Sequence, residues 1–277
     1  MRRIIVMLTV SLAFASPLFA GQSSDTPILV IGASFENGKT PINDALAAPV
    51  GGVAVNLGSY LSLGDALVRT EHLNGMVINE AQGGATTFDR AACLSDSCLP
   101  IYWQGYEKQL RKALMRVAVP DPANPQQPLY YNAKYLVVGT ANDCLHADAF
   151  GVPQGESTPC GTAQLNAYLD RLLAVGRQAQ ALGITPVYYA YPKYEDLDLP
   201  LAKQLYGISW IMDEQSFNEM RDLHRTRLAA ELPGALVVDA WKHFQNIGDG
   251  LHPKPKSTSD AAKRIADAIN NHMKHGK

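Results

Sequence analysis

The sequence predicts an α/β domain of three layers, in which a central, mostly parallel sheet of five strands lies between two layers of helices. Five short apolar runs recur along the chain, and the stretches between them carry apolar residues at helical spacing. The runs are continuously apolar instead of alternating, which is typical of parallel strands covered on both faces. Strands that alternate with helices favour crossover connections and a doubly wound sheet.

The five predicted strands are rich in Val, Ile, Leu or Tyr, and they span residues 28–32, 76–79, 135–139, 185–190 and 235–239. Helical spacing predicts helices over residues 60–72, 102–117, 163–182, 214–232 and 257–272. Ligands of such sheets bind beyond the carboxyl ends of the strands. The residues that follow each strand are therefore where chemistry is expected.

Three segments are predicted to be long loops: residues 36–58, residues 118–134 with four prolines, and residues 144–160. Residues 53–57 could add a short strand. Loops of this length usually bind ligands, cover a site or contain an element that the pattern does not reveal. None has the composition of a domain linker, so residues 21–277 are predicted to form a single domain.

The first twenty residues are predicted to be a signal peptide. Arg2 and Arg3 precede an apolar run over residues 4–14, and Pro17 comes shortly before a small residue, Ala20, where cleavage is expected. The run is shorter than the roughly 20 apolar residues of a transmembrane helix. No cysteine adjoins the cleavage site. We therefore expect export to the periplasm or the medium, with no stable membrane anchor.

The charge balance is weakly acidic. The chain has 24 Lys and Arg against 26 Asp and Glu, and removal of Arg2 and Arg3 leaves 22 against 26, a net charge of −4. There are no long runs of basic residues. This balance argues against a nucleic-acid partner and gives no electrostatic reason to bind anionic lipid.

The four cysteines are predicted to form structural disulfides, because an even number in an exported chain indicates pairing. Three pairings are possible, and proximity favours Cys93–Cys98 and Cys144–Cys160. A zinc site more often has two Cys-x-x-Cys pairs, and neither spacing fits. No metal is expected.

Residues suited to nucleophilic catalysis follow the first and last strands. Ser34 lies on a small-residue turn at the end of the first strand, which would expose its hydroxyl. Asp249 precedes His252 by three residues after the last strand. A carboxylate at that spacing can hold one ring nitrogen of the imidazole while the other nitrogen faces a serine. Either motif alone is common in unrelated turns.

Candidate oxyanion donors follow the second and third strands. Gly83 and Gly84 lack a Cβ, so a backbone N–H there can approach a substrate oxygen, and the amide of Asn142 can also donate. Taken singly, these residues would be read as a turn and a cap. Four strand ends that supply a nucleophile, a backbone donor, an amide donor and an Asp/His pair at one edge of the sheet together indicate a serine hydrolase.

These motifs resemble the SGNH hydrolases, also called GDSL-type esterases and lipases, from residue 28 to about residue 264. The resemblance implies a flavodoxin-like fold, with Ser34 as nucleophile, Asp249 and His252 as its activating pair, and Ser34, Gly84 and Asn142 as oxyanion donors. The family commonly has aspartate at the position of Ala33. The sequence leaves the hydrogen bonding of the nucleophile turn open at this point. The motifs that carry the resemblance are Gly32-Ala33-Ser34, Gly84-Ala85-Thr86-Thr87, Gly139-Thr140-Ala141-Asn142-Asp143 and Asp249-Gly250-Leu251-His252-Pro253.

The resemblance implies hydrolysis of carboxylic esters, whether short acyl esters, acetylated sugars or lipids, through an acyl-enzyme and without a metal or organic cofactor. Three alternatives remain open, and one of them, a structural or interaction protein, is supported by no repeat, coiled coil or large charge feature. The same residues would transfer an acyl group to an exported carbohydrate if a sugar hydroxyl replaced water. A catalytically silent exported binding protein would keep the pocket alone.

Tyrosines crowd the end of the fourth predicted strand. Two are expected to pack in the core, and Tyr191 or Tyr194 could instead line a substrate rim, although packing is favoured. Four histidines outside the Asp/His pair are expected to be bystanders. The four tyrosines are Tyr188, Tyr189, Tyr191 and Tyr194, and the histidines are His72, His146, His224 and His243.

Overall fold

The structure, a computed structural model, describes residues 27–37, 61–70, 73, 76–94, 97–123, 126, 129–144, 160–206 and 213–275, without the side chains of residues 90–103 and 203–206. The predicted signal peptide, most of the first long loop with its possible strand, His72, and the interior of the third loop with His146 lie outside the described residues.

The centre of the molecule is a five-stranded parallel sheet with the strand order β2-β1-β7-β8-β9. All five predicted strands are confirmed, and their ends differ from the prediction by no more than one residue. Their bounds are β1 (Ile28–Ile31), β2 (Val77–Asn79), β7 (Tyr135–Val138), β8 (Thr185–Tyr189) and β9 (Leu236–Val238).

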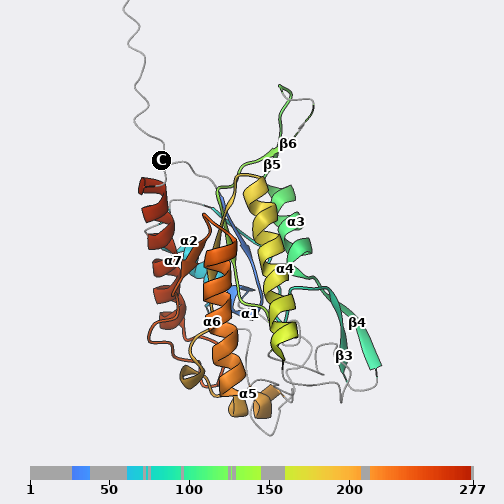
Figure 1. Cartoon of the computed structure of the whole chain (residues 1–277), viewed down its shortest axis with the longest axis vertical. Helices are drawn as coiled ribbons and strands as arrows, with labels where there is room; N and C mark the ends of the chain where they lie inside the picture. The colour runs from blue at the N-terminus through green and yellow to red at the C-terminus, as the bar shows by residue number, and fades with distance from the viewer. Residues whose placement is uncertain are drawn as a thin grey trace, which may run out of the picture.

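Helices flank the sheet on both faces, so the predicted three-layer α/β/α architecture is confirmed (Figure 1). On one side α2 packs against α7, and on the other α4 packs against both α3 and α6. The helix bounds are α2 (Leu63–Val68), α3 (Tyr106–Arg116), α4 (Thr162–Ala181), α6 (Glu214–Glu231) and α7 (Pro255–His275).

Local hydrogen bonds explain where two of these helices begin. The Ser62 hydroxyl accepts from the Asp65 backbone N–H at 2.9 Å and so caps α2. Asp213 accepts from the Ser216 N–H at 2.7 Å at the start of α6. Both helices therefore start where a side chain replaces a missing backbone acceptor.

Two hairpins correct the sequence prediction. Residues 102 and 103, predicted as helix, belong to β4 (Ser97–Trp103), which pairs antiparallel with β3 (Arg90–Leu94). The predicted loop over residues 118–134 contains an antiparallel pair, β5 (Ala118–Pro120) and β6 (Leu129–Tyr131). A two-stranded ribbon outside the main sheet needs no continuous apolar run, so the pattern that revealed the central strands does not reveal it.

Three short helices also escaped the prediction, because each is too short to show a helical period. They are α1 (Ser34–Asn37), the 3-10 helix η3 (Tyr194–Asp196) and α5 (Leu199–Tyr206).

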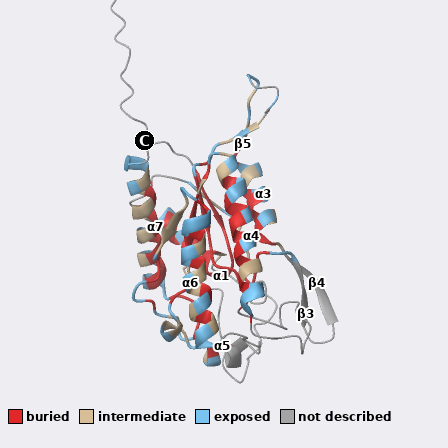
Figure 2. Cartoon of the chain, viewed as in Figure 1, coloured by how far each residue is buried: buried red, intermediate tan, exposed pale blue. Residues whose placement is uncertain are grey.

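The core lies on both sides of the central strands, and buried residues line the sheet and the inward sides of the helices (Figure 2). Every residue of β1 and β7 is buried, whereas those of the edge strands β2 and β9 are half-buried or exposed. Burial of a large aliphatic side chain contributes roughly 1.5–3 kcal/mol. The turns that follow β1 and β7 therefore start from the most firmly packed strands of the sheet.

One of the two predicted disulfides is confirmed. Cys144 is bonded to Cys160 and links the segment after β7 to the start of α4. Cys93 and Cys98 occupy facing positions in the register of β3 and β4, but their side chains lie outside those the structure describes.

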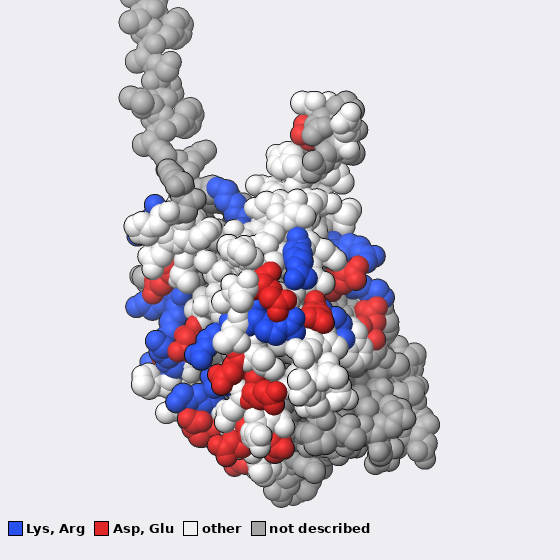
Figure 3. Space-filling view, in the orientation of Figure 1, with Lys and Arg blue, Asp and Glu red and all other residues white. Residues whose placement is uncertain are grey.

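Charges of both signs interleave over the face formed by α4, α6 and α7 (Figure 3). Arg227 on α6, for example, bonds Asp170 on α4 at 2.8 Å and also Glu231 one turn further along its own helix. In the part of the chain that the structure describes, no helix combines the length and the apolar character needed to cross a membrane.

Candidate active site

The sheet reverses its strand order at β1, which lies between β2 and β7. A crevice at the carboxyl ends of such strands is the usual ligand site of a doubly wound sheet. Backbone hydrogen bonds join the segments that leave these strands. The Gln82 N–H donates to the Gly32 carbonyl at 3.1 Å, and the Asn142 N–H donates to the Ala85 carbonyl at 3.2 Å. The segments after β1, β2 and β7 are therefore held side by side.

Ser34 and His252 meet at this edge. Ser34 is the first residue of α1, directly after β1, and its side chain is buried. The Nε2 atom of His252 lies 3.0 Å from the Ser34 Oγ atom, although 218 residues separate the two along the chain. The structure thus brings together two residues that the sequence analysis named near opposite ends of the chain.

Asp249 completes a chain of three buried side chains. Its Oδ2 atom lies 2.7 Å from the Nδ1 atom of His252. Because a carboxylate can only accept, we infer that Nδ1 carries the proton and that Nε2 is left to accept from Ser34. Asp249 also accepts at Oδ1 from the backbone N–H groups of Leu251 and His252, both at 2.8 Å.

The loop that carries this pair is closed by its own backbone. The Ile247 N–H donates to the His252 carbonyl at 2.8 Å, and Asn246 accepts from the Gly248 N–H at 2.9 Å. Gly250 has a φ of +82°, and a Cβ at that position would lie 2.1 Å from the Asp198 carbonyl oxygen. Only glycine therefore fits between the Asp/His pair and the start of α5.

Asn142 is held in one orientation. Its Nδ2 atom donates to the Ala85 carbonyl at 3.0 Å, and its Oδ1 atom accepts from the Tyr191 hydroxyl at 3.1 Å. A carbonyl oxygen is only an acceptor, which settles which end of the amide faces Ala85. The amide nitrogen carries a second hydrogen, which the bond to Ala85 does not use.

Tyr191 therefore has a role that the sequence analysis missed. It is buried, as the packing interpretation expected, but its hydroxyl contacts a candidate site residue. Tyr188 and Tyr189 are fully buried in the core, and Tyr194 packs edge-on against Phe217. The group of tyrosines at the end of the fourth strand was the one feature of the sequence that could have indicated this role. The sequence alone does not show which of their hydroxyls contacts Asn142.

Gly84 lies on the segment that follows β2. Its φ of +79° is in the left-handed region that favours glycine, and the residue is buried. Its neighbour Ala85 supplies the carbonyl that binds both the backbone and the amide of Asn142. Gly84 is thus fixed next to the Asn142 segment.

A partly buried ion pair joins these two segments to α4. Asp143 accepts from the Thr87 N–H at 2.8 Å and from Arg171 Nη2 on α4 at 2.9 Å, and its carboxylate also bonds the Thr87 hydroxyl. Arg171 Nε contacts the same hydroxyl at 2.5 Å. The residue next to Asn142 and the third residue after Gly84 are therefore tied to one helix.

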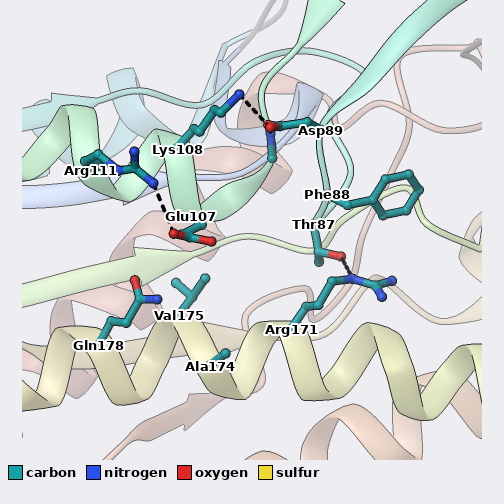
Figure 4. Close-up of a pocket in the computed structure, with 11 residues that line it drawn as sticks. Thr87, Phe88, Asp89, Glu107, Lys108, Arg111, Arg171, Ala174, Val175 and Gln178 are labelled. Atoms are coloured by element: carbon teal, nitrogen blue, oxygen red, sulfur yellow. Dashed lines mark hydrogen bonds and ion pairs between the residues drawn. The ribbon is translucent and has the colours of Figure 1, made fainter.

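A cavity of about 280 Å³ opens beside this ion pair, between α3 and α4 (Figure 4). The exposed ring of Phe88 lies 5.2 Å from the guanidinium carbon of Arg171. The other charged groups of the wall are paired, Lys108 with Asp89 at 2.6 Å and Arg111 with Glu107 at 3.1 Å. A second, more open depression of about 500 Å³ adjoins the loop that carries Asp249 and His252, at Phe244, Ile247 and Lys254.

The predicted nucleophile turn, residues 32–37, has no polar side chain at Ala33. Two of its backbone N–H groups nevertheless have side-chain acceptors. The Gly32 N–H donates to Gln109 Oε1 on α3 at 2.8 Å, and the Ala33 N–H donates to Glu36 Oε2 at 2.6 Å. Glu36 and Gln109 are both buried. The sequence analysis missed both, because neither belongs to a strand-end motif.

The other described histidines lie elsewhere. His224 on α6 is buried between Tyr168 and Tyr188, and burial lowers its pKa to about 3. His243 is exposed and has a φ of 57°. Among the described residues, no group of three or more His, Cys, Asp or Glu side chains is arranged to hold a metal ion.

No protein-family profile matches this sequence, and no curated protein matches it. Solved structures do match. A carbohydrate acetylesterase family member from Sinorhizobium meliloti superposes with a TM-score of 0.52 at 17% identity, over 91% of this chain and 100% of that chain. A second structure has a TM-score of 0.53 at 16% identity, over 91% of this chain and 99% of that chain.

A catalytic mutant of an acetylxylan esterase from Geobacillus stearothermophilus superposes less closely, with a TM-score of 0.46 at 14% identity, over 89% of this chain and 94% of that chain. The chain has the three-layer fold of the SGNH, or GDSL-type, hydrolases, as the sequence motifs predicted.

Proposed function

We propose that this protein is an exported serine esterase that cleaves carboxylic esters through an acyl-enzyme. The observation that supports the proposal best is the buried chain of contacts from Asp249 through His252 to Ser34, at 2.7 Å and 3.0 Å. It lies where the strand order reverses and where ligands of such sheets bind. Serine, imidazole and carboxylate in this order form the general machinery of acyl transfer.

In the first half-reaction, His252 Nε2 takes the Ser34 proton as Oγ forms a bond to the ester carbonyl carbon. Asp249 orients the imidazole and stabilises its positive charge. The tetrahedral intermediate then loses the alkoxy group, which leaves with the proton from His252 as an alcohol. In the second half-reaction, His252 takes a proton from water, the resulting oxygen attacks the acyl-enzyme, and the Ser34 hydroxyl is restored as the carboxylic acid departs.

The developing oxyanion would be bound by the backbone N–H groups of Ser34 and Gly84 and by the Asn142 amide. Donors that are fixed before the reaction are worth the most, because they need no reorganisation as the charge appears. Asn142 fits this requirement, since Ala85 and Tyr191 hold both ends of its amide.

Export is proposed from the N-terminal segment and is supported by the Cys144–Cys160 bond, because stable disulfides are mostly found in exported proteins. The proposed substrates are small-molecule, carbohydrate or lipid esters. Charged residues of both signs surround the two cavities. They do not indicate that the alcohol portion of the substrate ester is strongly charged.

The test is labelling of the purified mature protein by a fluorophosphonate, followed by hydrolysis of p-nitrophenyl acetate. We expect the wild type to be labelled and Ser34→Ala and His252→Ala to remain unlabelled. Ser216→Ala, a change in the first turn of α6, is the matched control and should be labelled normally. Folded wild-type protein that neither reacts with the probe nor cleaves the ester would contradict the proposal.

A further inference from the structure

Glu36 lies buried under the nucleophile turn, with its side chain 0% exposed. Its carboxyl group fills the space between the ends of β1 and β7. A Cβ at Gly32 would lie 2.2 Å from Glu36 Oε2, and a Cβ at Gly139 would lie 2.2 Å from Glu36 Cδ. The position of this carboxyl group therefore requires glycine at both places. Glu36 is thus packed into the turn that carries Ser34.

The carboxyl group of Glu36 has few hydrogen-bonding partners. Oε2 accepts from the Ala33 N–H at 2.6 Å, and Oε1 has no partner among the described residues. A buried carboxylate normally needs several donors or a cation, and a group without them takes up a proton instead. Consistent with this geometry, burial raises the pKa of Glu36 to about 8, against a smaller opposing effect of the Ala33 and Glu36 backbone N–H groups.

We propose that Glu36 is an uncharged positioning residue, a carboxylic acid that holds the Ala33–Ser34 backbone so that the Ser34 N–H faces the oxyanion. The inference rests on the esterase function proposed above. Two consecutive N–H groups before Ser34 are bound by side chains, that of Gly32 by Gln109 and that of Ala33 by Glu36. Ala33 has no polar side chain. Its backbone N–H nevertheless donates a hydrogen bond to Glu36, and this bond holds the turn.

The titratable groups around Glu36 come from other elements. Tyr106 on α3, Tyr168 on α4 and Tyr191 after β8 all respond electrostatically to Glu36, and burial raises the pKa of each above its ordinary value. These three phenols therefore stay neutral near pH 8. Asp143 is paired with Arg171, and His252 is bonded to Asp249.

Loss of the Glu36 proton would place an uncompensated charge beneath Ser34. The pKa of Glu36 is higher in the folded protein, about 8, than the ordinary value of 4.5 that applies when the chain unfolds. Its contribution to stability is therefore fully present below about pH 4.5 and is lost as the pH rises through about 8. Turnover should fall over the upper part of the same range.

The experiment compares Glu36→Gln, Glu36→Ala and a charge-matched control, Glu219→Gln, which changes an exposed residue of α6. Glutamine keeps the acceptor for the Ala33 N–H and cannot ionise. We expect Glu36→Gln to retain kcat within about threefold at pH 6.5 and to lack the decline that the wild type and the control show through pH 8. Glu36→Ala should lose roughly 10- to 100-fold in kcat with little change in KM, which corresponds to about 1.4–2.7 kcal/mol in the activation barrier.

The Tm of each protein, measured from pH 5 to pH 9, is a second readout. The Tm of the wild type should fall relative to that of Glu36→Gln as the pH rises. An infrared carbonyl band of a protonated carboxylic acid should be present in the wild type at neutral pH and disappear near pH 8. This measurement uses the wild type alone, so it does not depend on whether a variant folds.

Two results would overturn the inference. The first is the same decline of kcat above pH 7.5 in Glu36→Gln as in the wild type. The second is a wild type without the protonated band at pH 6.5. Wild-type protein that shows the band but is not labelled by the fluorophosphonate would instead contradict the esterase function and leave the charge state of Glu36 established.

Discussion

The proposed nucleophile turn, residues 32–37, and the proposed catalytic loop, residues 246–254, each place a buried carboxyl group close to Ser34, but the two groups have opposite surroundings. Asp249 accepts at least three hydrogen bonds, from the N–H groups of Leu251 and His252 and from the His252 ring. Glu36 accepts one from the Ala33 N–H, and its second oxygen has no partner among the described residues. Because hydrogen-bond donors around a buried carboxyl group favour its charged form, we expect Asp249 to be ionised and Glu36 to keep its proton.

The backbone explains the difference. Asp249 has a short side chain in a loop with positive φ at both flanking glycines, Gly248 and Gly250, and this path turns successive N–H groups toward its carboxylate. Glu36 lies within the short helix α1 and bends back to the N–H of a preceding residue. The loop around Asp249 supplies several donors at once, whereas the turn before α1 supplies one to Glu36.

The largest expected effect comes from replacing each of the two carboxyl groups by an amide. Asp249→Asn should lower kcat by about 10⁴-fold, because an amide cannot hold the productive His252 tautomer, whereas Glu36→Gln should change kcat little at pH 6.5. The measurement is ester turnover by the two variants, with circular dichroism to confirm folding. Equal losses in both variants would mean that the two carboxyl groups are not in different charge states.

A smaller effect is expected at the amide donor. Asn142→Ala should reduce kcat by about 10²–10³-fold with KM nearly unchanged, because the oxyanion exists only after attack. Tyr191→Phe removes only the hydroxyl that donates to Asn142 Oδ1. We therefore expect kcat of this variant to fall by only about tenfold. A Tyr191→Phe variant as impaired as Asn142→Ala would show that the tyrosine acts on the substrate and not through the amide.

The smallest expected effect on turnover concerns the Cys144–Cys160 bond, which begins two residues after Asn142 and closes a loop with a sequence separation of 16. A loop of this length stabilises a fold by roughly 3 kcal/mol in the chain-entropy model. Mild reduction should lower turnover a few-fold before the domain unfolds, since Asn142 becomes less firmly held. Unchanged activity in protein whose bond is open by mass analysis would separate this bond from the site.

Much of the fold could be predicted because its decisive features are local. Five apolar runs gave the five strands of the sheet, and helical spacing located the long helices within a few residues. The hairpins β3–β4 and β5–β6 could not be found in this way. Their strands lie outside the central sheet, and β5 and β6 are only three residues long with proline in one of them.

The candidate site divides along the same line. Ser34, Asp249, His252 and Asn142 were predicted as site residues because each follows a strand, and parallel strands bring their carboxyl ends to one edge. Gln109 and Arg171, which contact the segments that carry these residues, were missed because their contacts span long stretches of chain. Gly32 and Gln109 are 77 residues apart, and Thr87 and Arg171 are 84 apart.

By itself, the sequence determined the layer architecture and the strand ends at which polar residues gather, because hydrophobic periodicity and strand length are properties of short segments. Only the tertiary structure decided that the Gly32 N–H donates to Gln109, that Tyr191 orients Asn142, and that Thr87 and Asp143 are both bound by Arg171. Those outcomes depend on which distant groups meet in a water-poor interior, and no local pattern encodes that meeting.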